Sequence, residues 1–369
     1  MIPVNEPLLD GNERKYLNEC IDTGWISSEG PFVERFENAF ATRVGRRHGI
    51  AVANGSVALD LAVSVLGIGP GDEVIMPTFT IISCAAAIVR AGATPVLVDC
   101  NPVTFNMDIA AVAARITPRT KAIMAVHIYG LPTDMQPLVA LAKLHSLALI
   151  EDAAEMHGQT CRGTPCGSFG DISTFSFYSN KHVTTGEGGM VVTDDTALAE
   201  RCRSRRNLCF RAEERFVHRE LGWNFRLTNL QAAIGLAQLE RLDTFVARKR
   251  RMGALYTEQL AGVPGLILPA SRTEYADSIY WVFGLLLDAQ VPFDAREMIA
   301  RLADRAVGAR PFFWPMHEQP VFREMGLFQG ESHPVAERIA RRGLYIPSGM
   351  ALTDAQLHEA AATVRELLQ

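Results

Sequence analysis

The segment 149–190 places an acid, a hydroxyl and a lysine at short spacing, and a turn with three glycines follows them. Asp152 comes directly after an apolar run, Ser176 lies five residues before Lys181, and the turn spans residues 186–189. A lysine amine can form a Schiff base with a carbonyl, a carboxylate can pair with a ring nitrogen, and a hydroxyl can hold a phosphate. The spacing therefore predicts amine–carbonyl chemistry at one site.

Each of these residues also has a simpler interpretation. Lys181 alone would be read as a solvated surface lysine, and Asp152 alone as an exposed residue at a strand end. An acid after a buried strand can instead lie at the carboxyl edge of a parallel sheet, where α/β proteins bind ligands. Taken together, the three residues favour a site for pyridoxal 5'-phosphate (PLP), with Asp152 keeping the pyridine nitrogen protonated.

A second candidate anion site is Asn54-Gly55-Ser56, which precedes a periodic apolar segment, 57–66. Gly55 and Ser56 at a helix start would offer free amides and a hydroxyl to a phosphate. A plain helix cap without a ligand fits the same residues. The chain contains no G-x-x-x-x-G-K-[ST] sequence, which argues against a P-loop.

The remaining polar patterns favour structural roles. His127, His157 and His317 are isolated in the sequence, as packing histidines usually are, and the arginines of 201–211 suit a solvated helix face. The seven cysteines form no zinc-type arrangement, so we expect buried thiols and no metal.

Composition sets the broad class of the protein. The 369 residues are 48% hydrophobic and carry a net charge of -5, which predicts roughly two domains and favours neither nucleic acid nor an acidic membrane as partner. The N-terminus lacks the pattern of a signal peptide, and the longest mostly apolar stretch, 76–89, is too short to span a bilayer. We therefore expect a cytoplasmic protein.

Short apolar runs alternate with helix-length segments over the first two-thirds of the chain. This alternation predicts an α/β domain with a largely parallel sheet, because strands covered on both faces are apolar throughout. The expected strands are Glu73–Met76, Pro95–Val98, Ala122–His127, Ala148–Glu151, Ile172–Phe177 and Met190–Thr193, with helices at Ser83–Ala91 and Met135–His145.

The pattern changes near residue 228. Thr228 and Gln231 form a capping box, which predicts a long helix to about Leu260. A strand over 280–287 and helices over 336–342 and 355–368 follow. We therefore predict a large domain, residues 1–240, and a smaller C-terminal α+β domain, residues 241–369.

At this point three motifs resemble those of the DegT/StrS group of nucleotide-sugar aminotransferases. They are Glu151-Asp152-Ala153-Ala154-Glu155, Ser176-Phe177-Tyr178-Ser179-Asn180-Lys181 and Thr184-Thr185-Gly186-Glu187-Gly188-Gly189. The similarity spans nearly the whole chain and includes the segments 25–30, 54–56, 222–226 and 310–317. It implies the aspartate aminotransferase fold, which is fold type I of the PLP-dependent transferases.

The resemblance also implies a role for individual residues. Lys181 would carry the cofactor and shuttle protons, Asp152 would pair with the pyridinium, Ala154 would pack on the ring, and Glu155 would lie near the ring hydroxyl. Gly55, Ser56 and Ser176 would hold the phosphate. Asn224 would reach the phosphate of a neighbouring subunit, so the active unit would be a homodimer, with pairing into tetramers open. Trp25, Ser27 and His317 lie in segments that border the sugar-nucleotide pocket in the family.

The implied reaction takes an amino group from L-glutamate, with pyridoxamine phosphate as the intermediate form of the cofactor. Within the family, the segment 25–28 and the pair Asn180-Lys181 most resemble members that aminate carbon 4 of GDP-4-keto-6-deoxymannose for surface polysaccharide. Alternatives are another dTDP-, UDP- or GDP-linked keto sugar, amination at carbon 3, a pyridoxamine-phosphate-dependent sugar dehydratase, or a non-catalytic regulator. One residue departs from the family: Ile81 stands where an aromatic residue often stacks on the cofactor, and Phe79 is a candidate to compensate.

Overall fold

The computed structural model describes all residues 1–369 and contains a large α/β domain with a seven-stranded sheet. The strand order is β1-β9-β8-β5-β4-β2-β3. Only β9 is antiparallel to its neighbours, and the pairs from β8 to β3 are parallel. The strands are β1 His48–Val52, β2 Glu73–Pro77, β3 Thr94–Val98, β4 Thr120–Val126, β5 Ala148–Asp152, β8 Ile172–Ser176 and β9 Gly189–Thr193.

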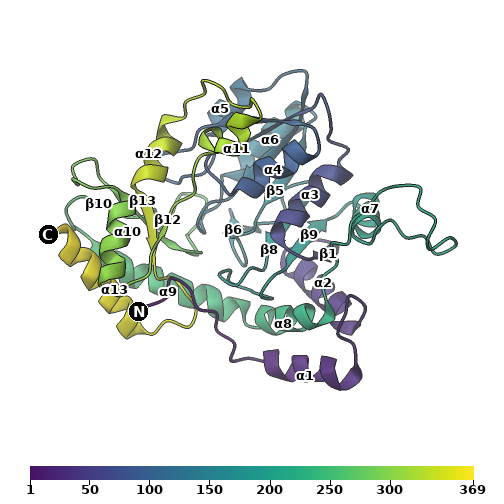
Figure 1. The fold of residues 1–369 in the computed structure, drawn as a ribbon, viewed down its shortest axis with the longest axis horizontal. Helices are drawn as coiled ribbons and strands as arrows, with labels where there is room; N and C mark the ends of the chain where they lie inside the picture. The colour runs from purple at the N-terminus through teal and green to yellow at the C-terminus, as the bar shows by residue number, and fades with distance from the viewer.

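Helices cover both faces of this sheet (Figure 1). One hydrophobic core lies between one face of the sheet and the helices α3 and α4. A second core lies between the other face and the helices α2, α6 and α8. The helices of this domain are α1 Glu13–Thr23, α2 Pro31–Arg43, α3 Gly55–Val65, α4 Ile82–Arg90, α5 Ile109–Ala114, α6 Met135–Leu144, α7 Thr196–Arg206 and α8 Asn229–Leu239. A small hairpin, β6 Thr160–Cys161 and β7 Thr164–Pro165, follows β5.

The C-terminal part begins with α9, Leu242–Leu260, and forms a second, four-stranded sheet in the order β10-β11-β13-β12. Residues at the N-terminus join this part, because Ile2 pairs with Val307. Its other elements are β10 Leu266–Ile267, β11 Phe283–Leu287, α10 Ala295–Asp304, β12 Arg310–Pro311, η1 Met316–Glu318, α11 Pro320–Glu324, α12 Pro334–Arg342, β13 Gly343–Ile346 and α13 Asp354–Leu368.

The sequence patterns located all six expected strands of the large sheet and missed β1. The predicted capping box is present, with Thr228 accepting from the Gln231 amide. The prediction of a single long helix after it was wrong, because the chain turns at Glu240–Arg241 and forms two helices, α8 and α9. The turn has a packing reason: α8 packs on α1 and α2 of the large domain, whereas α9 packs on α13. The proposed domain boundary falls in this turn.

None of the helices combines the length and the apolar character that a bilayer crossing requires.

Candidate active site

A cavity of about 730 Å³ opens at the carboxyl edge of the large sheet, between the two parts of the chain. Because β5 and β8 are parallel neighbours, their last residues, Asp152 and Ser176, reach the same edge. Trp281, Phe313 and Tyr345 line the cavity from the C-terminal part. The predicted site residues that line it are Gly55, Ser56, Asp152, Ala154, Glu155, Ser176 and Lys181.

Asp152 is buried at the end of β5 and has few hydrogen-bond partners. One carboxylate oxygen accepts from the Ala154 amide at 3.1 Å, and the other accepts from the Cys84 thiol at 3.2 Å. Burial raises the pKa of this carboxyl, and the two hydrogen bonds and the charge of Lys181 oppose the rise. Asp152 therefore keeps acceptor capacity for a ligand in the cavity.

The Lys181 amine faces a second carboxylate. Its side chain is 9% exposed, and Nζ lies 3.8 Å from Glu155 Oε1. Burial lowers the pKa of Lys181, while the charges of Glu155 and Asp152 favour its ammonium form. Burial also raises the pKa of Glu155 to about 8, against the effect of Lys181. Burial thus favours the neutral form of both groups, and the neutral form of an amine is the one that attacks a carbonyl.

The start of α3 provides an anion-binding corner beside Ser176. Asn54 caps the helix, since its side chain accepts from the Val57 amide at 3.0 Å. The amides of Gly55 and Ser56 precede any intrahelical acceptor and carry the positive end of the helix dipole. Gly55 allows the close approach, because a Cβ there would lie 2.8 Å from the Ser176 Cβ. This geometry suits a phosphate.

Two buried polar atoms at the cavity have no partner within the protein. They are Thr174 Oγ1 and Asn180 Oδ1, and both residues line the cavity. Buried polar groups are nearly always satisfied, so such atoms indicate a polar ligand or ordered water. Together with the amine, the carboxylates and the helix start, they fit a phosphorylated aromatic aldehyde such as PLP.

Two glycines of the turn 186–189 allow close packing within the protein. A Cβ at Gly189 would meet the Asn54 backbone at 2.5 Å, and a Cβ at Gly188 would meet the Thr185 hydroxyl at 2.1 Å. Gly189 therefore lets β9 approach the start of α3, and Gly188 lets the turn fold closely over Thr185.

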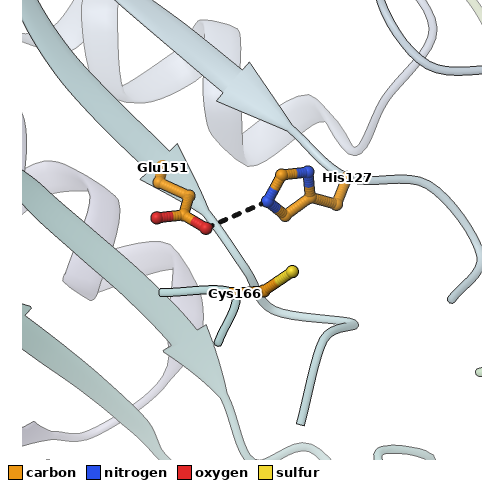
Figure 2. Close-up of side chains that lie close together, drawn as sticks. All are labelled: His127, Glu151 and Cys166. Carbon is orange, nitrogen blue, oxygen red and sulfur yellow. Dashed lines mark hydrogen bonds and ion pairs between the residues drawn. The ribbon is translucent and has the colours of Figure 1, made fainter. Parts of the chain in front are cut away.

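His127, Glu151 and Cys166 are the most buried group of residue types that could hold a metal (Figure 2). The ligand atoms of His127 and Glu151 are already engaged in hydrogen bonds. His127 Nε2 donates to Glu151 at 3.1 Å, and its Nδ1 accepts from the Thr133 amide. Burial raises the pKa of the Cys166 thiol well above its usual range, which opposes the thiolate that a metal requires. We assign no metal to this cluster.

Comparison with known proteins decides the family. The model of the DegT/DnrJ/EryC1/StrS aminotransferase family matches residues 7–365. The chain belongs to this aminotransferase family. Two relatives named GDP-perosamine synthase, from Vibrio cholerae and Caulobacter vibrioides, are 42% and 43% identical to it. The first alignment covers 97% of both chains, and the second covers 100% of this chain and 98% of the relative.

A solved structure confirms fold type I. The aminotransferase TlmJ from Streptoalloteichus hindustanus superimposes with a TM-score of 0.93 at 33% identity, over 99% of this chain and 98% of that one. The expected family and fold class are therefore confirmed. This aminotransferase has a large domain with a mostly parallel sheet and a smaller C-terminal α+β part.

Four residues with expected roles lie outside the cavity lining of this aminotransferase chain. Asn224 and Ser27 are exposed, and Trp25 is 49% exposed. His317 is buried, with its ring bonded to Thr78 and Glu337. None of the four reaches the Lys181 site within one chain, so their roles stay predictions.

Ile81 lies in the cavity wall and is 44% exposed. Phe79 does not compensate for the missing aromatic residue, because it is buried outside the cavity lining, where its ring packs with Tyr129, Phe312 and Phe313. A cofactor ring beside Ile81 would therefore meet an aliphatic side chain.

Sequence reasoning missed several lining residues of the aminotransferase site. Thr80 and Thr174 could have been suspected, since both lie at or near strand ends on the carboxyl edge. The residues from the C-terminal part gave no local signal, because their approach to Lys181 depends on how the two parts of the chain pack. The lining residues that were missed include Thr80, Thr174, Asn180, Trp281, Phe313 and Tyr345.

Proposed function

We propose that this aminotransferase uses PLP to move the amino group of L-glutamate to carbon 4 of GDP-4-keto-6-deoxymannose, giving GDP-perosamine for surface polysaccharide. The observation that carries the proposal is the buried Lys181 amine beside Glu155 at the sheet edge where β5 ends in Asp152. The choice of sugar rests on the two full-length relatives named GDP-perosamine synthase.

The residues divide the chemistry among them. PLP in this site would supply an electron-accepting ring for the carbon that loses or gains a proton. Asp152 would hold the proton of the pyridine nitrogen, and the α3 start with Ser176 would fix the phosphate. Lys181 Nζ, as a free amine, would take the proton from the amino-donor carbon and deliver it to the cofactor carbon on the other side of the transferred nitrogen. Glu155 would orient the ring hydroxyl.

The lysine test is Lys181→Ala. We expect the wild-type protein to develop a visible Schiff-base band with PLP, which L-glutamate bleaches and the keto sugar restores. The variant should show no band and no turnover. Retained transamination in the variant would remove Lys181 from the mechanism, and a wild-type protein without a band would refute the PLP assignment. GDP-, dTDP- and UDP-linked keto sugars, compared by kcat/KM, test the sugar choice separately.

We further propose that the active unit is a homodimer with shared sites. The cavity lining contains only one lysine and one arginine, Lys181 and Arg90, and Arg90 is paired with Asp60. The cofactor and substrate together bring three phosphates. The segment 207–222 projects from the body beyond α7 (Figure 1) and exposes Phe216, Leu221 and several arginines. Such a segment, with Asn224 at its base, suits contact with a second copy.

Mixing two inactive variants tests the shared site. If Asn224 serves the partner's site, dimers of Lys181→Ala with Asn224→Ala contain one intact site, and random mixing restores about a quarter of wild-type activity. Mixtures that stay inactive would show that each chain uses its own Asn224, and an Asn224→Ala protein that is active by itself would show that the site does not use Asn224. Light scattering reports whether dimers form and whether they pair further.

The dehydratase alternative requires histidine in place of the lysine. Lys181 is present, and the neighbouring His182 is buried outside the cavity lining, with Nε2 3.2 Å from the Ile279 carbonyl oxygen. The position of His182 therefore does not favour the dehydratase alternative.

A further inference from the structure

Trp281 brings an aromatic face from the C-terminal part of the chain onto the Lys181 amine. It precedes β11 and is 4% exposed. Lys181 Nζ lies 3.7 Å from the centre of its ring, on the face of the π-system. A cation over a ring face at this distance is attracted by the ring quadrupole. The amine thus lies between the Glu155 carboxylate and an indole ring.

Both ends of Trp281 are held by hydrogen bonds. Its indole Nε1 donates to the carbonyl oxygen of Asn180 at 2.9 Å, directly before the lysine in sequence. Its own carbonyl oxygen accepts from Lys249 Nζ at 2.8 Å. Phe313 stacks against the ring, with an interplanar angle of 17°. The indole therefore has one orientation relative to the backbone of Lys181.

Lys249 is unusual because it is a buried lysine that binds only backbone oxygens, those of Trp281 and Ser348. No carboxylate pairs with it. Burial and the charge of Lys181 lower the pKa of Lys249 to about 7. A buried lysine without a counter-ion is costly, and its two hydrogen bonds offset part of this cost while they fix the carbonyl groups of Trp281 and Ser348.

The charged and titratable groups around Lys181 come from several elements. Glu155 and Asp152 favour its ammonium form. Lys249, His157 and His182 are buried nearby, and Lys181 lowers the pKa of each of the three. The indole face is therefore an uncharged group that favours the ammonium form in a region crowded with basic side chains.

We propose that Trp281 is a positioning residue, which orients the free Lys181 amine and stabilises its ammonium form through its ring face. Lys249 and the Asn180 carbonyl fix the indole for this task. The consequence for catalysis rests on the proposed function, whereas the effect on the amine itself is a property of the chain alone.

The test measures the protonation of Lys181 in the protein without PLP. Competitive acetylation across pH 6–11, followed by mass spectrometry of the peptide with Lys181, gives the pKa of that amine. Trp281→Leu should lower it by about half a unit to one and a half units, since a ring face stabilises a desolvated cation to that extent. Trp281→Phe keeps a ring face and should shift it less. Trp281→Met serves as a second aliphatic variant if the leucine variant does not fold.

Phe313→Leu is the matched control. It also removes an aromatic lining residue that packs on Trp281, but no contact joins Phe313 to Lys181 Nζ. A purely structural role of Trp281 predicts equal, small pKa changes in the leucine variants of both residues, and this result would overturn the proposal. An unshifted pKa in both aliphatic Trp281 variants would also overturn it.

In the active enzyme, the pH profile of kcat should move with the Lys181 pKa, while KM for the keto sugar changes less. The two proposals fail separately. If Lys181 forms no Schiff base with PLP but its pKa falls in Trp281→Leu, the proposed function fails and the role of Trp281 stands. If Lys181 forms the Schiff base but its pKa is unchanged in Trp281→Leu, the proposed function stands and the role of Trp281 fails.

Discussion

Glu151 and Asp152 are consecutive carboxylates that point to opposite faces of β5, and they differ in how completely they are hydrogen-bonded. Both are buried. Glu151 accepts from His127, from the amides of Gly167, Phe169 and Gly170 and from the Ser173 hydroxyl, at 2.6 to 3.2 Å. Asp152 accepts only from the Ala154 amide and a thiol.

The pKa directions follow from this difference. Burial alone would raise the pKa of Glu151, but the hydrogen bonds from His127 and the two nearest amides lower it below its usual value. The pKa of Asp152 stays raised, because its few donors do not offset burial. Both carboxylates are buried, so the number of hydrogen bonds that each accepts is what distinguishes them. Glu151 fixes a loop to the sheet, whereas Asp152 is available to a ligand.

The largest effect should come from Asp152→Asn. Loss of the carboxylate that would pair with the ring nitrogen of PLP should lower kcat/KM at least ~10²-fold, since it removes stabilisation of developing charge. Folding stability should be unchanged or higher, because the charged form is costly to bury. Steady-state kinetics and urea unfolding of the apoprotein measure the two quantities. A stable variant with near wild-type activity would contradict the role of Asp152.

Glu151→Gln should show the opposite pattern. An amide offers its NH₂ group to donors that need an acceptor, so the free energy of unfolding should fall by ~2–4 kcal/mol. Ser173→Ala removes a single donor and should cost only about 1 kcal/mol. PLP affinity of the folded fraction should be nearly unchanged. If Glu151→Gln lost PLP binding without losing stability, the distinction between the two faces of β5 would fail.

The pH dependence of stability sharpens the comparison through Glu155. Its pKa is raised to about 8, so the native protein binds a proton that the unfolded chain releases near pH 4.3. The contribution of Glu155 to stability is therefore present in acid and is lost as pH rises toward 8. Glu155→Gln should be more stable than wild type at pH 9, with the difference shrinking toward pH 5 by a few kcal/mol (~2–4).

Urea unfolding of the apoprotein at pH 5, 7 and 9 gives this difference directly. Glu151→Gln serves as the control without pH dependence, because the pKa of Glu151 is lowered and its contribution to stability is lost only below about pH 4.5, outside this range. A Glu155→Gln difference that is constant across this range would mean that Glu155 is ionised throughout.

The comparison also explains what the sequence could predict. Asp152, Ser176 and Lys181 were identified because each follows a recognisable strand, and parallel strand ends meet at one edge. The difference between Glu151 and Asp152 was not visible, since the donors of Glu151 come from the loop 167–173, which has no regular pattern. Trp281 and Lys249 were missed for a similar reason. Trp281 is 101 residues from Asn180 and 32 residues from Lys249 in the sequence. Only the packing of the two parts of the chain brings these segments to Lys181.

The prediction of secondary structure failed at two places where the hydrophobic periodicity carried no information. The β1 segment, His48–Val52, includes a histidine and a glycine in five residues, so it lacks the uniform apolar run of the other strands. The turn at Glu240–Arg241 contains neither proline nor glycine, and the apolar helical pattern continues through it. The chain turns there because α8 and α9 have different packing partners, which a local pattern does not contain.

The smallest predicted effect tests the comparison at a single hydrogen bond. Cys84 donates its thiol to Asp152 Oδ2 at 3.2 Å, and this bond lowers the Asp152 pKa. Cys84→Ser replaces a weak donor by a strong one and makes Asp152 more like Glu151, so Asp152 should become less basic and kcat should fall several-fold, within about 1 kcal/mol. Cys84→Ala removes the donor and should leave kcat equal or higher, with some loss of stability from the small cavity. Opposite signs in the two variants, measured as kcat and as PLP affinity by fluorescence titration, are the expected result. A fall of equal size in both would show that Cys84 acts by packing, and that unused acceptor capacity is not what distinguishes Asp152 from its neighbour.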